Sequence, residues 1–235
     1  MSIIIAMDFD DSKKAIDFLA LFKEPVIAKI GMELFYKSGP DIVEKIKKLG
    51  HQIFIDLKLC DIPNTVYSAM KVIGSYGADI VNLHAFGGIK MMKEAKRGLV
   101  EGSTGKVAKL IAVTQLTSSD PEMIKNELLI DTPLNECILQ YAKNAKLAGL
   151  DGVVCSPLEV RIIKEAIGED FLTLTPGIRY PEAGADDQFR ITTPEMAGKL
   201  KTDYIVVGRP ITRAENPIAS YQKINKDYLG GKNES

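Results

Sequence analysis

Short apolar runs alternate with amphipathic stretches along the whole sequence, and this rhythm constrains the fold more than any other feature. Eight such runs, rich in β-branched residues, begin at intervals of 23, 26, 28, 28, 44, 19 and 33 residues. Most are apolar at successive positions, as strands buried on both faces are. We therefore predict strands at Ile3–Met7, Val26–Ile30, Gln52–Leu57, Ile80–His84, Ala108–Val113, Gly152–Cys155, Phe171–Thr175 and Tyr204–Val207.

The intervening stretches have the apolar spacing of helices that cover a sheet. The clearest are Asp11–Phe22, Asp41–Leu49, Asn64–Ser75, Ile89–Val100, Leu134–Leu147 and Leu158–Ile167. Eight strand–helix units in 235 residues fit a (β/α)8 TIM barrel, which typically has roughly 250 residues. A doubly wound open sheet is the main alternative. It usually carries a glycine-rich turn after its first strand, where this chain has Asp8-Phe9-Asp10-Asp11, so we favour the barrel.

The chain shows no Ser/Gly/Pro-rich linker and no charge block, which predicts a single α/β domain over residues 1–235. The polar end, residues 230–235, is expected to fray. The longest interval between the starts of successive predicted strands contains Leu116–Asp131, which we interpret as an extra loop with a short helix after the fifth strand. Gly177–Ile191 is the other irregular stretch, where a mobile lid would be useful.

Composition excludes several classes of function. With 30 Lys+Arg against 31 Asp+Glu, the net charge of −1 gives no general attraction to nucleic acid or anionic lipid. The longest stretches without a charged residue have ten residues, whereas a membrane helix needs about 20. The first residues lack the basic lead of a signal peptide. Three distant cysteines and two histidines predict a reduced, cytoplasmic protein without a multi-histidine zinc site.

Polar residues gather at the predicted carboxyl ends of the strands, where a barrel carries its active site. They are Asp8, Lys29, Asp56, Lys58, His84, Thr117, Arg179, Gly208 and Arg209. Of these, His84 also fits a buried histidine whose hydrogen bonds are satisfied. His51 precedes a strand at the opposite end and is expected on the surface.

The third predicted strand carries two charges on one side. Because strand side chains alternate, Asp56 and Lys58 point the same way, into a crowded interior where unpaired charge is costly. A structural ion pair beside a solvated Asp61 is one interpretation. Since Lys29 and Asp8 are also expected to converge here, we favour a catalytic group of charges.

The last two strands end in features typical of phosphate sites. Val206–Ile211 has the pattern of a strand, a tight turn at Gly208 and a helix start at Arg209. Such a segment would offer backbone N–H groups and the two-pronged guanidinium group of Arg209 to a phosphate. The preceding strand adds Arg179, and Gln188 lies in the loop between them. Barrels often bind phosphate at these two loops.

The segment Asp56–Thr65 reads Asp-Leu-Lys-Leu-Cys-Asp-Ile-Pro-Asn-Thr. It resembles the signature Asp-x-Lys-x-x-Asp-Ile-Pro-Asn-Thr of the orotidine 5'-phosphate decarboxylases. The resemblance covers nearly the whole chain, through residues 6–8, 29–35, 114–118, 175–179, 187–188 and 207–212. It is to the short bacterial form, without a fused phosphoribosyltransferase domain. Phe86 stands where a smaller residue is commoner in the family, and we expect it to affect only packing near the mouth.

The resemblance implies decarboxylation of orotidine 5'-monophosphate (OMP) to uridine 5'-monophosphate (UMP) and CO2. This is the last step of de novo UMP synthesis, and it needs no metal or cofactor. Lys58 would be the proton donor to C6 of the pyrimidine, and Asp56 would lie beside the substrate carboxylate in a network with Asp61 and Lys29. The family also implies a homodimer in which Asp61 and Thr65 reach the neighbouring subunit's site.

The same resemblance distributes the other parts of the nucleotide over the predicted site. Asp8 and Lys29 would bind ribose hydroxyls, and Thr117 the pyrimidine edge. The phosphate would be bound by Arg179, Gln188, Gly208 and Arg209. The chemistry is consistent with these roles, because loss of CO2 leaves negative charge on a carbon that a fixed ammonium can stabilise. Carboxylates around Lys58 favour its charged form.

Two alternatives stay open. The sugar-phosphate branch of the superfamily, hexulose-phosphate synthases and keto-gulonate phosphate decarboxylases, shares the Asp-x-Lys-x-x-Asp core and holds Mg2+. Those sites need a carboxylate on the second strand, where this chain has Lys29, whose ammonium would repel the metal. The other alternative is a catalytically silent nucleotide-binding module.

Overall fold

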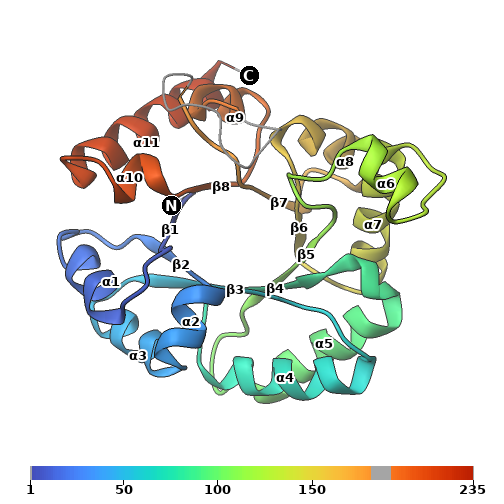
Figure 1. The fold of residues 1–235 in the computed structure, drawn as a ribbon, viewed down its shortest axis with the longest axis horizontal. Helices are drawn as coiled ribbons and strands as arrows, with labels where there is room; N and C mark the ends of the chain where they lie inside the picture. Colours follow the sequence, from blue (N-terminus) through green and yellow to red (C-terminus); the bar gives the residue numbers. More distant parts are fainter. Residues whose placement is uncertain (1, 181–191, 235) are drawn as a thin grey trace.

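Eight parallel strands close into a barrel in the computed structural model, which describes residues 2–180 and 192–234 (Figure 1). Each strand pairs with the next along the chain, and β1 pairs with β8. This closed sheet confirms the predicted (β/α)8 barrel and excludes the doubly wound alternative. The strands are β1 (Ile3–Ala6), β2 (Ile27–Gly31), β3 (Gln52–Leu59), β4 (Ile80–His84), β5 (Lys109–Val113), β6 (Gly152–Val154), β7 (Leu172–Thr175) and β8 (Tyr204–Val207).

Helices surround the barrel on its outside (Figure 1). In the described residues, none of them combines the length and the apolar character that a membrane crossing requires. The α-helices are α1 (Ser12–Leu19), α2 (Met32–Ser38), α3 (Asp41–Lys48), α4 (Pro63–Ser75), α5 (Gly88–Gly102), α6 (Pro121–Asn126), α7 (Leu134–Leu147), α8 (Val160–Ile167), α9 (Pro194–Lys199), α10 (Arg209–Thr212) and α11 (Pro217–Asn233), and the 3-10 helices are η1 (Ala85–Gly87) and η2 (Pro157–Glu159).

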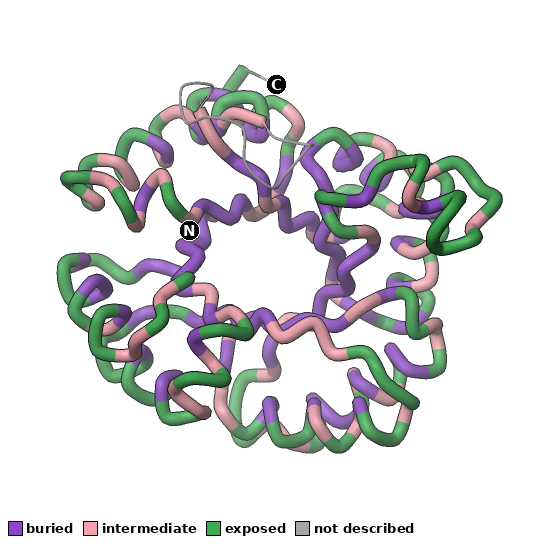
Figure 2. Tube along the Cα trace, in the orientation of Figure 1, coloured by how far each residue is buried: buried purple, intermediate pink, exposed green. Residues whose placement is uncertain are grey.

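Two apolar layers explain why the strands are apolar at successive positions. Side chains such as Ile4 and Phe54 fill the inside of the barrel, whereas Ile3, Ile5 and Ile55 belong to the layer that also contains the buried faces of the helices. Figure 2 shows the strands mostly buried around the ring and the outer helices exposed on the side away from it. Every strand except β7 therefore contributes apolar side chains to both layers, as expected for a parallel sheet covered by helices; β7 contributes Leu174 to the inner layer.

The end of the chain differs from the prediction. Residues 230–235 are expected to fray, yet α11 continues to Asn233 and Gly231 is buried. A Cβ at Gly231 would lie 2.0 Å from the carbonyl oxygen of Glu195 in α9, so the two helix backbones touch there. Lys199 of α9 also forms a salt bridge of 2.9 Å with Glu234. The close packing of α11 against α9 holds this segment in place. The polar composition of the segment gives no sign of that packing.

His51 also differs from the prediction of a surface residue. It is buried, and its Nδ1 accepts a hydrogen bond of 3.3 Å from the backbone N–H of Val26. Because Nδ1 is the acceptor, Nε2 carries the proton and donates to the carbonyl oxygen of Leu19 at 3.1 Å. The ring satisfies one backbone group just before β2 and one at the end of α1, at the end of the barrel opposite the predicted site.

Candidate active site

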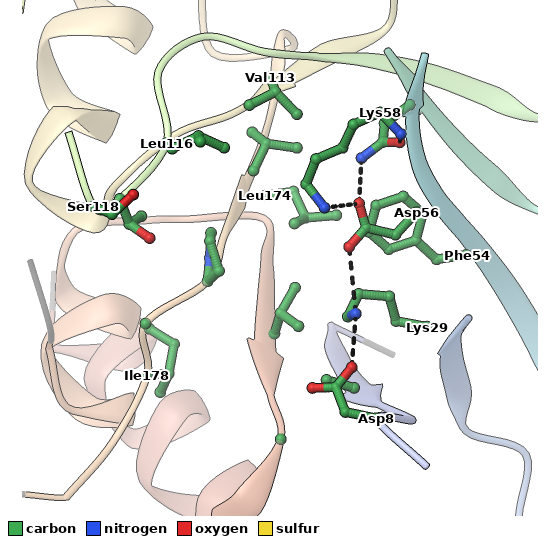
Figure 3. A pocket seen from close by; sticks show the side chains of 18 of the residues that line it. Asp8, Lys29, Phe54, Asp56, Lys58, Val113, Leu116, Ser118, Leu174 and Ile178 are labelled. Atoms are coloured by element: carbon green, nitrogen blue, oxygen red, sulfur yellow. Dashed lines mark hydrogen bonds and ion pairs between the residues drawn. The ribbon is translucent and has the colours of Figure 1, made fainter. Parts of the chain in front are cut away.

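A cavity of about 410 Å³ opens at the carboxyl ends of the strands (Figure 3). Eight of the residues predicted for the site line it, and they come from both halves of the sequence. They are Asp8, Lys29, Asp56, Lys58, Thr117, Arg179, Gly208 and Arg209. The barrel thus brings the predicted charged group and the predicted phosphate-binding residues into one cavity.

The backbone of β3 is irregular where it carries the two charges. Ile55 is paired with Val81 of β4, but the next paired residues are Leu59 and Leu83, so β3 has two extra residues in this interval. Lys58 lies within the bulge and has a positive φ of 51°, which is unusual for a residue with a side chain. The bulge is a local distortion at the predicted centre of the site, and alternation alone does not predict it.

Asp56 is the centre of the charge network (Figure 3). Its Oδ1 accepts from the Nζ of Lys58 at 2.6 Å, and its Oδ2 lies 3.3 Å from the Nζ of Lys29. Lys29 reaches on to Asp8 Oδ1 at 3.2 Å. A further donor, the side-chain amide of Asn82, lies 2.7 Å from Asp56 Oδ1. The side chain of Asp56 is only 10% exposed, so these contacts replace water around the carboxylate.

The electrostatics hold both Asp56 and Lys29 in their charged forms. Burial alone would raise the pKa of Asp56, but the ammonium groups of Lys29 and Lys58 outweigh it and lower that pKa below its ordinary value. Burial would likewise lower the pKa of Lys29, whereas the charges of Asp56 and Asp8 raise it. The site therefore contains ion pairs that support one another.

The ends of β7 and β8 supply the cationic part of the cavity. Arg209 begins α10, a helix of only four residues, so the dipole expected at its N-terminus is small and the backbone N–H groups matter more. The backbone N–H of Arg179 donates to the carbonyl oxygen of Thr192 at 2.9 Å, and the hydroxyl of Tyr180 donates to Asp227 of α11 at 2.5 Å. These bonds fix the backbone that carries Arg179. Gln188 lies outside the described residues.

The end of β5 contributes the remaining polar edge. Thr117 is buried and lines the cavity together with Gln115 and Ser118. The predicted short helix in this excursion is α6, which Asp120 caps by accepting from the backbone N–H of Met123 at 2.8 Å. Hydroxyl and amide groups at this edge can hydrogen-bond a heterocycle.

Three of the predicted residues, Asp61, Thr65 and His84, do not line this cavity. Asp61 and Thr65 are both exposed, and Asp61 Oδ1 accepts from the backbone N–H of Ile62 at 2.6 Å. His84 is half-buried near Lys58; burial and that ammonium lower the pKa of its imidazole. Among the described residues, no group of three or more His, Cys, Asp or Glu side chains is placed to hold a metal ion.

Asn82 lines the cavity and was not among the predicted residues. It is the only amide in the apolar run of β4, and it shares the inward face with Ile80, whose side chain belongs to the barrel interior. Asn82 could have been identified from the sequence as a polar residue on the inward face of a buried strand, because a buried amide needs hydrogen-bond partners.

Comparison with known proteins places these features in a family. Residues 1–224 match the model of the "Orotidine 5'-phosphate decarboxylase / HUMPS family". The chain belongs to this family. Among relatives named orotidine 5'-phosphate decarboxylase, that of Staphylococcus haemolyticus is 54% identical over 227 residues, which is 97% of this chain and 98% of the relative. That of Staphylococcus saprophyticus is 53% identical over 227 residues, with the same two coverages of 97% and 98%.

Solved structures of the Orotidine 5'-phosphate decarboxylase / HUMPS family have the same fold. The orotidine 5'-phosphate decarboxylase of Lactobacillus acidophilus superposes with a TM-score of 0.87 and 44% identity, covering 97% of this chain and 99% of that one. The enzyme of the same name from Pyrococcus horikoshii gives a TM-score of 0.76 at 27% identity, again over 97% and 99%. The match spans the whole barrel, including every strand that contributes to the cavity.

Proposed function

We propose that this protein decarboxylates orotidine 5'-monophosphate to uridine 5'-monophosphate and CO2 in pyrimidine biosynthesis, without a metal or cofactor. The observation that carries the proposal is the Lys58 ammonium, which lies 2.6 Å from Asp56 in a cavity also lined by Arg179 and Arg209. The names of the relatives agree with this activity. The cavity offers anion-binding residues for a nucleotide phosphate and a fixed cation for the reacting carbon.

The nucleotide would bind with its phosphate at Arg179, Gly208 and Arg209, joined by Gln188. The guanidinium groups of arginine and backbone N–H groups are donors that phosphate oxygens prefer. Its ribose hydroxyls would contact Asp8 and Lys29, and its pyrimidine edge would contact Thr117.

In the reaction, the bond between C6 and the carboxylate carbon breaks, and its electron pair stays on C6 as CO2 leaves. A proton then moves from the Nζ of Lys58 to C6, and Lys58 regains a proton from water. The ammonium lies ready where negative charge develops, so little reorganisation is needed at that moment. Asp56, beside the departing carboxylate, keeps the Lys58 ammonium in place through their 2.6 Å ion pair.

The arrangement of lysines favours the nucleotide branch of the family over the sugar-phosphate branch. A divalent cation at Asp56 would face the ammonium groups of Lys29 and Lys58, which lie 3.3 Å and 2.6 Å from the same carboxylate. Like charges at such distances repel strongly inside a protein. Asp56 is thus fitted to pair with lysines and poorly fitted to bind Mg2+.

We further propose a homodimer in which Asp61 and Thr65 complete the partner's site. The support is a group of exposed apolar side chains that follow three neighbouring strands: Met32 after β2, Ile62 after β3 and Phe86 after β4. Ile62 and Phe86 are 67% and 68% exposed. Exposed apolar residues grouped at one rim are typical of an interface. We also propose a cytoplasmic location, which the free thiols of the three cysteines favour.

The proposal is tested by following the loss of orotidine 5'-monophosphate by absorbance, with and without EDTA. We expect turnover that EDTA leaves unchanged. Activity that disappears with EDTA would instead support a metal-dependent enzyme. Binding of UMP without any turnover would support the silent nucleotide-binding module.

A further inference from the structure

Asn82 has both ends of its side-chain amide engaged at the centre of the charge network. It lies on β4 with 2% of its surface exposed. Its Nδ2 donates to Asp56 Oδ1 at 2.7 Å, and its Oδ1 accepts from the backbone N–H of Lys58 at 2.8 Å. One neutral side chain therefore contacts both members of the Asp56–Lys58 ion pair.

The bulge in β3 explains why the backbone contact matters. Between the paired residues Ile55 and Leu59 the register with β4 shifts, and Lys58 takes a φ of 51°. Its N–H accordingly donates to the Asn82 side chain at 2.8 Å. Without Asn82 this part-buried donor would lose the partner that the side chain supplies, and an unpaired backbone N–H withdrawn from water is costly. The amide thus supports the unusual backbone conformation from which the Lys58 side chain starts.

The contact with Asp56 matters because it orients the carboxylate group. Asp56 Oδ1 receives both Asn82 and Lys58, while Oδ2 faces Lys29. An amide donor fixes the carboxylate without adding charge. A carboxylate at position 82 would repel Asp56, and a lysine would add a third ammonium beside Lys29 and Lys58. A neutral residue with one donor and one acceptor at this separation meets both needs.

We propose that Asn82 is a positioning residue that sets the location of the Lys58 ammonium, through the backbone of Lys58 and through Asp56. This inference rests on the proposed decarboxylation. In this role Asn82 does not touch the substrate. It affects the reaction only through Lys58 and Asp56, the two residues that it contacts. Misplacement of a reacting group by about 1 Å can cost roughly 100-fold in rate.

The test compares Asn82→Ala and Asn82→Asp with wild type by kcat for OMP, Kd for UMP and thermal midpoint. We expect Asn82→Ala to lower kcat about 10- to 100-fold, with the UMP Kd within about twofold, because the arginines that bind phosphate are untouched. Asn82→Asp has nearly the same volume but loses the donor toward Asp56. We expect its kcat to fall at least as far as that of Asn82→Ala.

Val81→Ala is the matched control, because Val81 is an equally buried residue of β4 that belongs to the helix-side layer. It should lower the thermal midpoint and retain wild-type kcat. If Asn82 serves packing alone, Asn82→Asp will resemble wild type and Asn82→Ala will resemble Val81→Ala; that pattern overturns the proposal. Absence of turnover in wild type would refute the proposed function. In that case, crystal structures of wild type and Asn82→Asp decide the positioning role, and an unmoved Lys58 Nζ overturns it.

Discussion

At the scale of single residues, the Asp56 carboxylate determines the character of the site. Both of its oxygens are engaged, by Lys58 and Asn82 on one side and by Lys29 on the other. The buried Asp56 carboxylate attracts both ammonium groups, and this attraction offsets the repulsion between the two cations. The proposed chemistry depends on this arrangement, since it holds the Nζ of Lys58 beside the proposed position of the reacting carbon.

The lowered pKa of Asp56 predicts how stability depends on pH. A carboxylate with a folded pKa below its unfolded value of about 3.8 stabilises the fold above that value, and this contribution is lost as the pH falls through the folded pKa. Urea unfolding of Asp56→Asn and wild type should therefore differ most at neutral pH and converge as the pH falls below the ordinary value and through the lowered folded pKa. A difference that is independent of pH would contradict the ion-pair account.

Sequence reasoning located Asp56 and Lys58 at the cavity because both lie at the carboxyl end of a predicted strand, although the backbone at Lys58 departs from regular alternation. It missed the positive φ of Lys58 and the contacts of Asn82 with Asp56 and Lys58, which accompany the register shift between β3 and β4. His51 was misplaced for a related reason. Its two partners, the backbones of Val26 and Leu19, belong to segments far from it in the sequence.

At the scale of helices and strands, periodicity predicted some boundaries to the residue, as for β4, β8 and α7. It did not predict α2 or α11. Helix α2 begins directly after β2, without a separating loop, and α11 contains a Gly-Gly pair that resembles a helix end. In α11 the second of these glycines is instead a close contact with α9. Tertiary packing here outweighs local propensity.

A similar close contact between α4 and α5 gives a prediction. A Cβ at Gly102 would lie 1.8 Å from the carbonyl oxygen of Lys71, whereas one at Gly105 would meet nothing within 4 Å. Alanine favours helices over glycine by about 1 kcal/mol, but overpacking typically costs about 1–3 kcal/mol. Gly102→Ala should thus lower the free energy of urea unfolding, and Gly105→Ala should leave it nearly unchanged. Equal effects would show that α4 and α5 are packed less closely than described.

At the scale of the whole molecule, barrel closure brings residues as distant as Asp8 and Arg209 to one cavity. This part of the account could be predicted, because strand order and the carboxyl-end rule follow from the repeating pattern. The proposed dimer could not be derived from that pattern. Asp61 and Thr65 lie in the most recognisable motif of the chain, yet their side chains are exposed outside the cavity.

The proposed dimer predicts complementation between two inactive variants. Lys58→Ala and Asp61→Ala should each lose most activity as homodimers. When they are co-expressed in equal amounts, half of the dimers are mixed, and each mixed dimer keeps one intact site. About a quarter of wild-type activity should therefore return. If each Asp61 serves its own subunit's site, mixing will restore nothing.

The most direct test of the central claim is the kcat of Lys58→Ala with OMP, measured beside its affinity for UMP by calorimetry. The account predicts a loss of at least about 1,000-fold in kcat, since both a proton donor and a stabilising charge disappear. UMP should bind within a few-fold of wild type, because its phosphate contacts remain. A Lys58→Ala protein that binds UMP and turns over at a rate near wild type would contradict the claim.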